Sequence, residues 1–245
     1  MEARGYSKTW QENAERRGVP AAVVVEIARR HAITPESLQI LEEMEEIKDP
    51  HGKSYFLIPP GTGGHDAREA TLMTYIVNAG TDYGRPATRA ADFPETPYSA
   101  AEVARIMERQ KANRWSYSRD VRFVDRNGGR LVTTPNGMLM GLGGNWIQRP
   151  FSQRGGTTWG DIFMINIGNG TDPAEQLRRI VRSGHTSNLD LDRVLHHEER
   201  HSRQWAARGH AGMLRDYSWE LVRELVFGKA NRLEEDAGLS DGGYR

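Results

Sequence analysis

The chain has 245 residues, enough to bury a sizeable core, and its 33 basic residues balance 33 acidic ones, so the formal net charge is zero. A balanced charge creates no overall field toward nucleic acid or anionic lipid, so we expect no nucleic-acid partner and no membrane partner. The absence of cysteine excludes disulfides and thiolate metal sites, so a bound metal would need His, Asp or Glu ligands.

The N-terminal residues MEARGYSKTW contain no apolar core of a signal peptide, and the chain contains no run of 18 apolar residues. We therefore expect a protein without a membrane span. Its expected location is the cytoplasm, or outside the cell after export by a dedicated system that needs no signal peptide.

Short helices are predicted over the first hundred residues. Pro20 suits the first turn of a helix in GVPAAVVVEIARRHA, and Thr34 opens an apolar-periodic run that continues to Ile47. Asp66–Asn78 places its apolar residues on one helical stripe. The glycine-rich stretch 51–65 lacks the Lys-Ser/Thr pair of a phosphate-binding loop, so we expect an ordinary loop there.

The pattern changes after a helix that begins near Ser99, which has the spacing of a capping box with Glu102. VRFVD and RLVTT flank RNGG, a combination typical of a β-hairpin. The segments MLMGLGG, NWIQR and DIFMINI are then predicted as short strands, and Pro173 begins a helix that continues to about Ser183.

These patterns predict an α+β fold that is mainly helical, with a short antiparallel sheet next to a later helix. We expect a helical N-terminal lobe over residues 1–115 and a second, catalytic unit over residues 116–245. Basic and aromatic residues alternate in KANRWSYSRDVRF (111–123), as they do in single-strand nucleic-acid binders. Because the net charge is zero, we favour a solvated β-edge for this segment.

The segment 190–210, DLDRVLHHEERHSRQWAARGH, is predicted to be one helix, because it contains no Pro and no Gly before Gly209. Helix positions four apart lie one above the other, so His197 and His201 present two imidazoles to one point. Two such nitrogens can hold Zn²⁺, and Glu198 can accept a proton from metal-bound water. This His-Glu-x-x-His pattern is typical of peptide hydrolysis.

A second interpretation of this segment is a solvated helix face on which Glu199 and Arg200 make ordinary surface contacts, because HHEERHSR is polar throughout. Apolar residues of the same helix, such as Trp205, favour partial burial instead. His196 is expected to face another side of the helix. The extended metzincin spacing would need histidine at position 207, which Ala207 excludes.

A catalytic zinc ion keeps three protein ligands and one open position, so a downstream carboxylate is expected to complete the site. The candidates are Glu220, Glu224, Glu234, Glu235 and Asp236. We favour Glu234, because Gly228 can end the preceding helix and Asn231 can cap a short turn that directs Glu234 inward. The alternative is that Glu234 only completes a capping box with Asn231. Tyr217 or His210 could stabilise an oxyanion, although a tyrosine between Leu214 and Leu221 of a helix is more often a core residue.

The run LHHEERHSRQW, followed by MLRDYSWELVRELVFG and NRLEEDAG, resembles the small gluzincin-type zinc metallopeptidase domains of bacterial secreted effector and toxin-like proteins. The matching positions outside the His-Glu-x-x-His pattern are Gln204, Trp205, Tyr217, Asn231, Glu234 and Ala237, with Arg232 where the family usually has proline. The resemblance implies Zn²⁺ held by His197, His201 and Glu234, with Glu198 as general base.

The resemblance extends upstream to GGTTWGDIFMIN, Gly155–Asn166, which is similar to the strand that borders the active-site cleft in such domains. It implies a peptide or protein substrate that pairs with this edge, and in effector-like proteins a protein inhibitor or immunity partner. The alternative function is a metal-binding interaction domain without proteolytic activity. Glu198 argues against that alternative, because a purely structural zinc site does not need a general base.

Overall fold

The structure is a computed structural model of the 245 residues. It describes residues 5–83, 96–144, 156–166, 172–186, 188–227, 233 and 237, and for residues 216–227 only the backbone.

The described helices are α1 (Gly5–Arg16), α2 (Ala21–His31), α3 (Pro35–Leu38), the 3₁₀ helix η1 (Gln39–Leu41), α4 (Gly64–Asn78), α5 (Ala100–Ala112), the π-helical turn η3 (Ser116–Asp120), α6 (Val121–Arg126), α7 (Pro173–Ser183) and α8 (Leu191–Phe227). The described strands are β1 (Glu45–Lys48), β2 (Ser54–Leu57), β3 (Arg130–Thr133), β4 (Leu139–Leu142), β5 (Gly156–Trp159), β6 (Ile162–Ile165), β7 (His185–Thr186) and β8 (Leu189–Asp190).

The main sheet has six strands in the order β1-β2-β3-β4-β6-β5, and β7 and β8 form a small second sheet. β4 and β6 are parallel, whereas the other neighbouring strands of the main sheet are antiparallel. The predicted fold class, α+β and mainly helical, is confirmed, but the sheet is mixed and not purely antiparallel. β1 and β2 come from the region predicted as a helical lobe, so one sheet joins the two predicted units.

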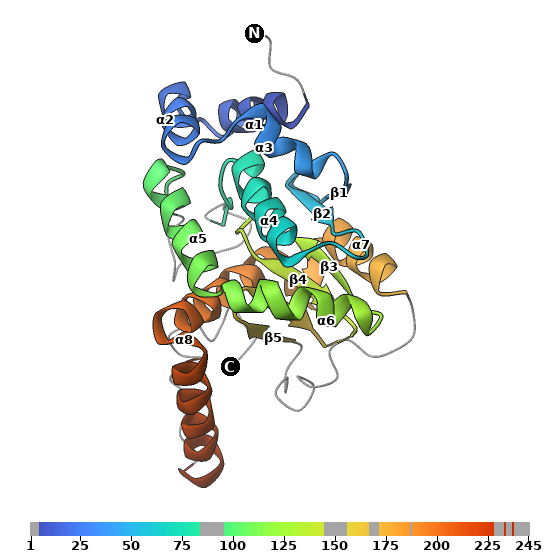
Figure 1. The fold of residues 1–245 in the computed structure, drawn as a ribbon, viewed down its shortest axis with the longest axis vertical. Coiled ribbons are helices and arrows are strands. Elements are labelled where there is room, and N and C mark those ends of the chain that lie inside the picture. The colour runs from blue at the N-terminus through green and yellow to red at the C-terminus, as the bar shows by residue number, and fades with distance from the viewer. Residues whose placement is uncertain are drawn as a thin grey trace.

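Helices cover both faces of this sheet (Figure 1). Successive side chains of a strand point to opposite faces, so Leu139 and Ile162 pack with residues of α1, α4 and α5, whereas Met140 and Phe163 pack with residues of α7 and α8. Burial on both faces explains why β4 and β6 are buried at every position and show no polar alternation.

Several predicted helices are confirmed. α2, α4, α5 and α7 occupy the predicted segments, and the Ser99 side chain accepts a hydrogen bond from the Glu102 backbone, as an N-cap residue should. Two predictions near the N-terminus are wrong. The helix that begins after Thr34 ends at Leu41 and is followed by β1, and the expected loop at 51–65 contains β2.

The predicted hairpin around RNGG is also wrong on its first side. VRFVD forms α6, in which Val121 and Val124 are buried at helical spacing, while RLVT forms β3 and pairs with β4. The predicted strands MLMGLGG and DIFMINI contain β4 and β6, and NWIQR lies outside the described residues.

Candidate metal centre

The predicted helix that carries the His-Glu-x-x-His pattern is the first part of α8. The Asp190 side chain accepts hydrogen bonds from the backbone N–H groups of Asp192 and Arg193, which caps the helix start. Gly209 has φ 69° and ψ 168°, so the regular helix is interrupted there before it continues to Phe227. The helix therefore starts and breaks at the predicted positions.

The polar residues His197, Glu198 and Glu199 of α8 are buried, which overturns the alternative of a solvated helix face. His197 is 2 % exposed, Glu198 8 % and Glu199 3 %. The apolar residues Val194 and Leu195 of the same helix lie in the core beside α7. Buried polar groups need specific partners, so each of these three side chains requires a structural or chemical explanation.

The two histidines have their Nδ1 atoms directed at hydrogen-bond acceptors. His197 Nδ1 lies 3.1 Å from the carbonyl oxygen of Ala237, and His201 Nδ1 lies 3.0 Å from Oε1 of Gln204. The Gln204 amide is oriented by its Nε2, which donates to the Leu233 carbonyl at 3.0 Å. Since a carbonyl oxygen can only accept, we assign a proton to Nδ1 of each ring, which makes Nε2 the nitrogen that can bind a metal.

This assignment leaves a lone pair on each Nε2 atom, and His197 Nε2 lies 3.0 Å from His201 Nε2. Two facing lone pairs repel each other unless a proton or a metal cation lies between them. Zinc binds imidazole nitrogen at about 2.0–2.1 Å, so two ligands at a tetrahedral angle are separated by about 3.3 Å. The observed separation is close to this value, and the two neutral nitrogens fit a zinc ion.

Glu198 is held by the edge strand of the main sheet. Thr158 of β5 donates a hydrogen bond from Oγ1 to Glu198 Oε2 at 2.6 Å. Trp205 of α8 donates from Nε1 to the backbone carbonyl of Thr158 at 3.0 Å. Two hydrogen bonds therefore join the predicted cleft edge to the helix that carries the histidines, and one oxygen of the Glu198 carboxylate is fixed in place.

The predicted third ligand, Glu234, lies outside the described residues, as do Glu235 and Asp236. The described positions on either side, Leu233 and Ala237, are buried, and their carbonyls accept hydrogen bonds from Gln204 and His197. Within the described ranges, His, Asp and Glu form no group of three or more that could hold a metal. Of the three predicted ligands, the structure thus describes two, His197 and His201, and both lie on α8.

The remaining residues considered for the site, His196, Tyr217 and His210, lie away from the His197–His201 pair or have undescribed side chains. The His196 ring packs on Tyr83 with 4.8 Å between ring centroids, which agrees with the prediction that it faces another side. The backbone of Tyr217 lies in α8 beyond the break, and its side chain is outside the described residues. His210 packs edge-to-face on Trp115 at 4.6 Å.

His210 joins a group of three rings that we call the tryptophan cluster: Trp115, Trp159 and Trp205. Their centroids lie 4.8–5.9 Å apart. The rings come from the residue just before η3, from β5 and from α8, so the cluster fills the junction between β5 and α8.

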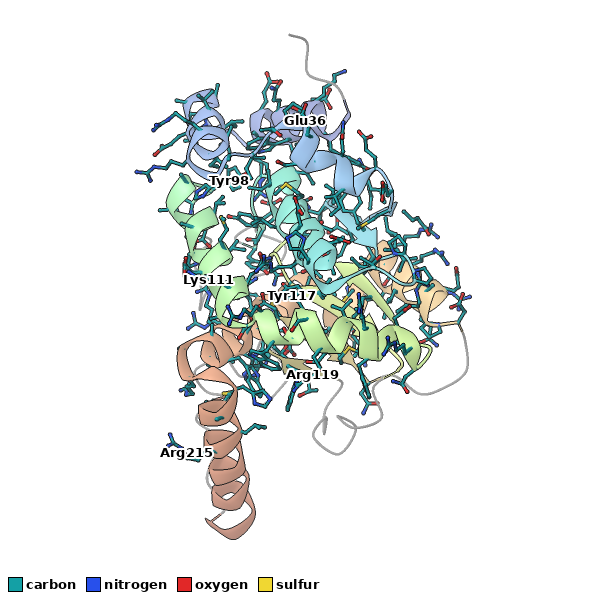
Figure 2. All side chains as sticks on the ribbon, in the orientation of Figure 1. Glu36, Tyr98, Lys111, Tyr117, Arg119 and Arg215 are labelled. Carbon is teal, nitrogen blue, oxygen red and sulfur yellow. The ribbon has the colours of Figure 1, made fainter. Side chains whose placement is uncertain are left out.

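The basic and aromatic segment 111–123 is helical, so the expected β-edge is wrong. Trp115 belongs to the tryptophan cluster, and Tyr117 is buried with its hydroxyl donating to Asp161 Oδ2 at 2.9 Å. Lys111 and Arg119 lie at the surface (Figure 2). Stacking on nucleic-acid bases requires accessible rings, so this arrangement does not favour single-strand binding.

Sequence reasoning missed a buried polar network on the side of α8 opposite the histidines. Glu199 Oε1 accepts hydrogen bonds from Arg105 Nη2 at 2.7 Å, Arg109 Nη1 at 2.9 Å and Arg203 Nη2 at 3.0 Å. Burial alone would raise the pKa of Glu199, but the charges of Arg109, Arg203 and Arg105 outweigh it and hold the pKa at about 2. Glu199 is therefore a buried carboxylate anchor and not a surface residue.

The chain was compared with protein-family models, curated proteins and solved structures, and none of them matches it. No helix within the described part of the chain is long and apolar enough to span a membrane.

Proposed function

We propose that the chain is a zinc-dependent hydrolase that cleaves peptide or protein substrates, with His197, His201 and Glu234 as zinc ligands and Glu198 as general base. The observation that carries the proposal is the pair of Nε2 atoms 3.0 Å apart, each on a ring whose Nδ1 proton is already directed at an acceptor. Helix geometry alone would bring the two rings together. The acceptors that face Nδ1 also keep the proton on that nitrogen, so that Nε2 has the lone pair that metal binding needs.

Zinc bound by these residues would polarise the scissile carbonyl and acidify a bound water molecule. The protein's own residues do the rest of the chemistry. Thr158 holds Oε2 of Glu198, so Oε1 is the oxygen available to take a proton from the attacking water. Glu198 then returns that proton to the leaving amine nitrogen as the peptide bond breaks, which regenerates the carboxylate.

The substrate is proposed to bind as an extended peptide along β5. Among the described strands, β5 is an edge strand of the main sheet, and its residue Thr158 contacts Glu198. An edge strand offers backbone N–H and C=O groups to an added strand. The Thr158 carbonyl already accepts from Trp205 Nε1, so a peptide would pair with the remaining backbone groups of β5 and run beside the general base. The side chain of Tyr217 remains our candidate for stabilising the oxyanion, on the strength of the family resemblance.

The decisive experiment begins with elemental analysis of the purified protein, for which we expect one zinc per chain. His197→Ala and His201→Ala should lose the metal and melt at a lower temperature, because a metal that binds only the folded state stabilises it. Glu198→Gln keeps the shape of the side chain but accepts no proton. It should keep the zinc and lose hydrolysis of a quenched fluorescent peptide mixture by at least ~100-fold.

Each possible failure has a distinct meaning. Equal zinc content in the parent protein and both histidine variants would refute the ligand assignment. Full activity of Glu198→Gln would point to another base. Zinc binding without hydrolysis in the parent protein would favour the non-proteolytic interaction domain instead.

A further inference from the structure

Two separate elements carry the proposed chemistry, and their relative position decides whether it works. α8 supplies His197, Glu198 and His201, whereas the hairpin of β5 and β6 supplies Thr158 and the edge for a peptide. A displacement of about 1 Å between reacting groups can lower a rate about 100-fold, so a protein of this kind needs a device that fixes the helix against the hairpin.

Arg109 of α5 contacts both elements. Its Nε donates to Asp161 Oδ1 at 3.1 Å, and its Nη1 donates to Glu199 Oε1 at 2.9 Å. Asp161 lies in the two-residue turn between β5 and β6, three residues after Thr158. Glu199 follows Glu198 directly. A single side chain from a third element therefore bridges the residue next to the general base and the turn of the hairpin that holds it.

All three guanidinium nitrogens of Arg109 donate hydrogen bonds, and the group is enclosed. Its third nitrogen, Nη2, donates to the backbone carbonyls of Gly137 at 2.6 Å and Asn136 at 3.1 Å, and the side chain is 2 % exposed. Asn136 in turn donates from Nδ2 to the Leu195 carbonyl of α8 at 2.8 Å. The guanidinium group of arginine is planar, and its N–H groups point in fixed directions. Its four contacts therefore determine the spacing of α8, the β5–β6 turn and the turn between β3 and β4.

The bridge acts from the side of α8 opposite the histidines. At about 100° per residue, Glu199 lies about 160° around the helix from both His197 and His201. Ser202, on the same rear side, also donates to Asp161. The rear of the helix is therefore fixed to the hairpin, on the side away from His197 and His201.

We infer that Arg109 is a positioning residue: it sets the register of the active helix against the edge strand and so places Glu198 relative to a peptide bound on β5. This inference rests on the proposed function. Asp161 also accepts hydrogen bonds from Tyr117, Asn113 and Ser202. Loss of the Arg109 fork therefore changes the spacing of the two elements without separating them.

The test compares Arg109→Lys with Arg105→Lys. Lysine keeps the charge in both variants but cannot reproduce the fork. Arg105 contacts the same carboxylate, Glu199, and contacts Glu102, but it does not reach the hairpin, which makes it the matched control. In Arg109→Lys we expect kcat on a cleaved fluorescent peptide to fall ~10- to 100-fold, whereas the zinc content and KM should change little. Arg105→Lys should stay within about two-fold of the parent.

A second readout does not depend on activity. Crystal structures of the variants should show the contact between Thr158 Oγ1 and Glu198 Oε2, 2.6 Å in the parent, lengthened in Arg109→Lys and retained in Arg105→Lys. If Arg109→Lys does not fold, Asp161→Asn weakens the same bridge from the hairpin side and should give the same pattern. Parental kcat and a parental contact in a folded Arg109→Lys protein would overturn the inference. A parent protein without zinc or hydrolysis would refute the proposed function, while the crystal structures would still decide on Arg109.

Discussion

Gln204 connects a proposed zinc ligand to the C-terminal segment. Its amide oxygen faces His201 Nδ1 and its amide nitrogen donates to the Leu233 carbonyl. The amide can satisfy both partners in only one orientation, so it fixes the tautomer and the ring position of His201 at once. Partners of this kind raise the basicity of a ligand and reduce its freedom to rotate.

Gln204→Ala should therefore weaken zinc binding ~10- to 100-fold although Gln204 is not itself a ligand. The affinity can be measured by competition with a chromophoric chelator. Gln204→Glu is the matched variant, because a carboxylate still accepts from His201 Nδ1 but cannot donate to Leu233. We expect its affinity to lie above that of the alanine variant, and an unchanged affinity in Gln204→Ala would show that His201 needs no such support.

Residues within one helix were accessible to sequence reasoning, and residues joined across the fold were not. His197, Glu198 and His201 lie within one helical turn and a half, so local geometry predicts that they are neighbours. Thr158 meets Glu198 across 40 residues and Arg109 meets Glu199 across 90. The signal that could have indicated an anchor was the position of Glu199 on the helix side opposite the histidines.

At the scale of elements, the break in α8 depends on one glycine. Gly209 adopts φ 69° and ψ 168°, a combination open essentially to glycine alone, and nothing lies within 4 Å of the position a Cβ would take. A side chain there is therefore disfavoured by backbone strain and not by a clash. Gly212 lies in regular helix, where a Cβ would make only an ordinary contact with Arg208.

Gly209→Ala should destabilise the protein by about 1–3 kcal/mol, whereas Gly212→Ala should be neutral or stabilise it by up to about 1 kcal/mol. Urea unfolding of the two variants beside the parent measures both effects. A Gly209→Ala variant as stable as the parent would mean that the chain passes this position without a positive φ.

Elements with caps and a clear helical period were predicted well, whereas those that depend on distant partners were not. α4 and α7 have apolar stripes and recognisable ends, so their sequences alone specify them. β1 exists because it pairs with β2, and its four residues show no strand signal by themselves. α6 was mistaken for a strand because a short apolar run fits either period.

For the whole molecule, the net charge is zero, but some of the charged side chains are buried, among them Glu199 and Arg109. The pKa of Glu199 is about 2 in the folded state, below its ordinary value of 4.5. A lowered pKa contributes stability above pH 4.5 that is lost as the pH falls toward 2, and the size of the shift corresponds to about 3 kcal/mol. Acid should therefore unfold this protein partly by protonating one carboxylate among three arginines.

Glu199→Gln should flatten the dependence of unfolding free energy on pH between about pH 4.5 and 2, and should also destabilise the protein at neutral pH by about 3–5 kcal/mol, because the arginines lose their partner. Denaturant titrations with a chelator present separate this effect from metal binding. The exposed Glu108 provides the control: Glu108→Gln should keep the parental slope. A parental slope in Glu199→Gln would assign the acid sensitivity to other groups.

The fold class of the molecule could be predicted from the sequence, but the order and pairing of its strands could not. Helix and strand segments gave α+β, yet the contact between Leu57 of β2 and Val132 of β3 joins residues from both predicted units. Because such a pairing leaves no local pattern, the sequence could not show that one sheet runs through both units.

The tryptophan cluster gives the junction between β5 and α8 a spectroscopic signal. Three of the six tryptophans have ring centroids 4.8–5.9 Å apart; one precedes η3, and the others lie on β5 and α8. Indole transitions at such separations couple, so the folded protein should show a strong near-ultraviolet circular dichroism couplet and rapid energy transfer among these rings. A peptide that settles along β5, or any change that moves this strand away from the helix, would alter that spectrum in a protein without an added label.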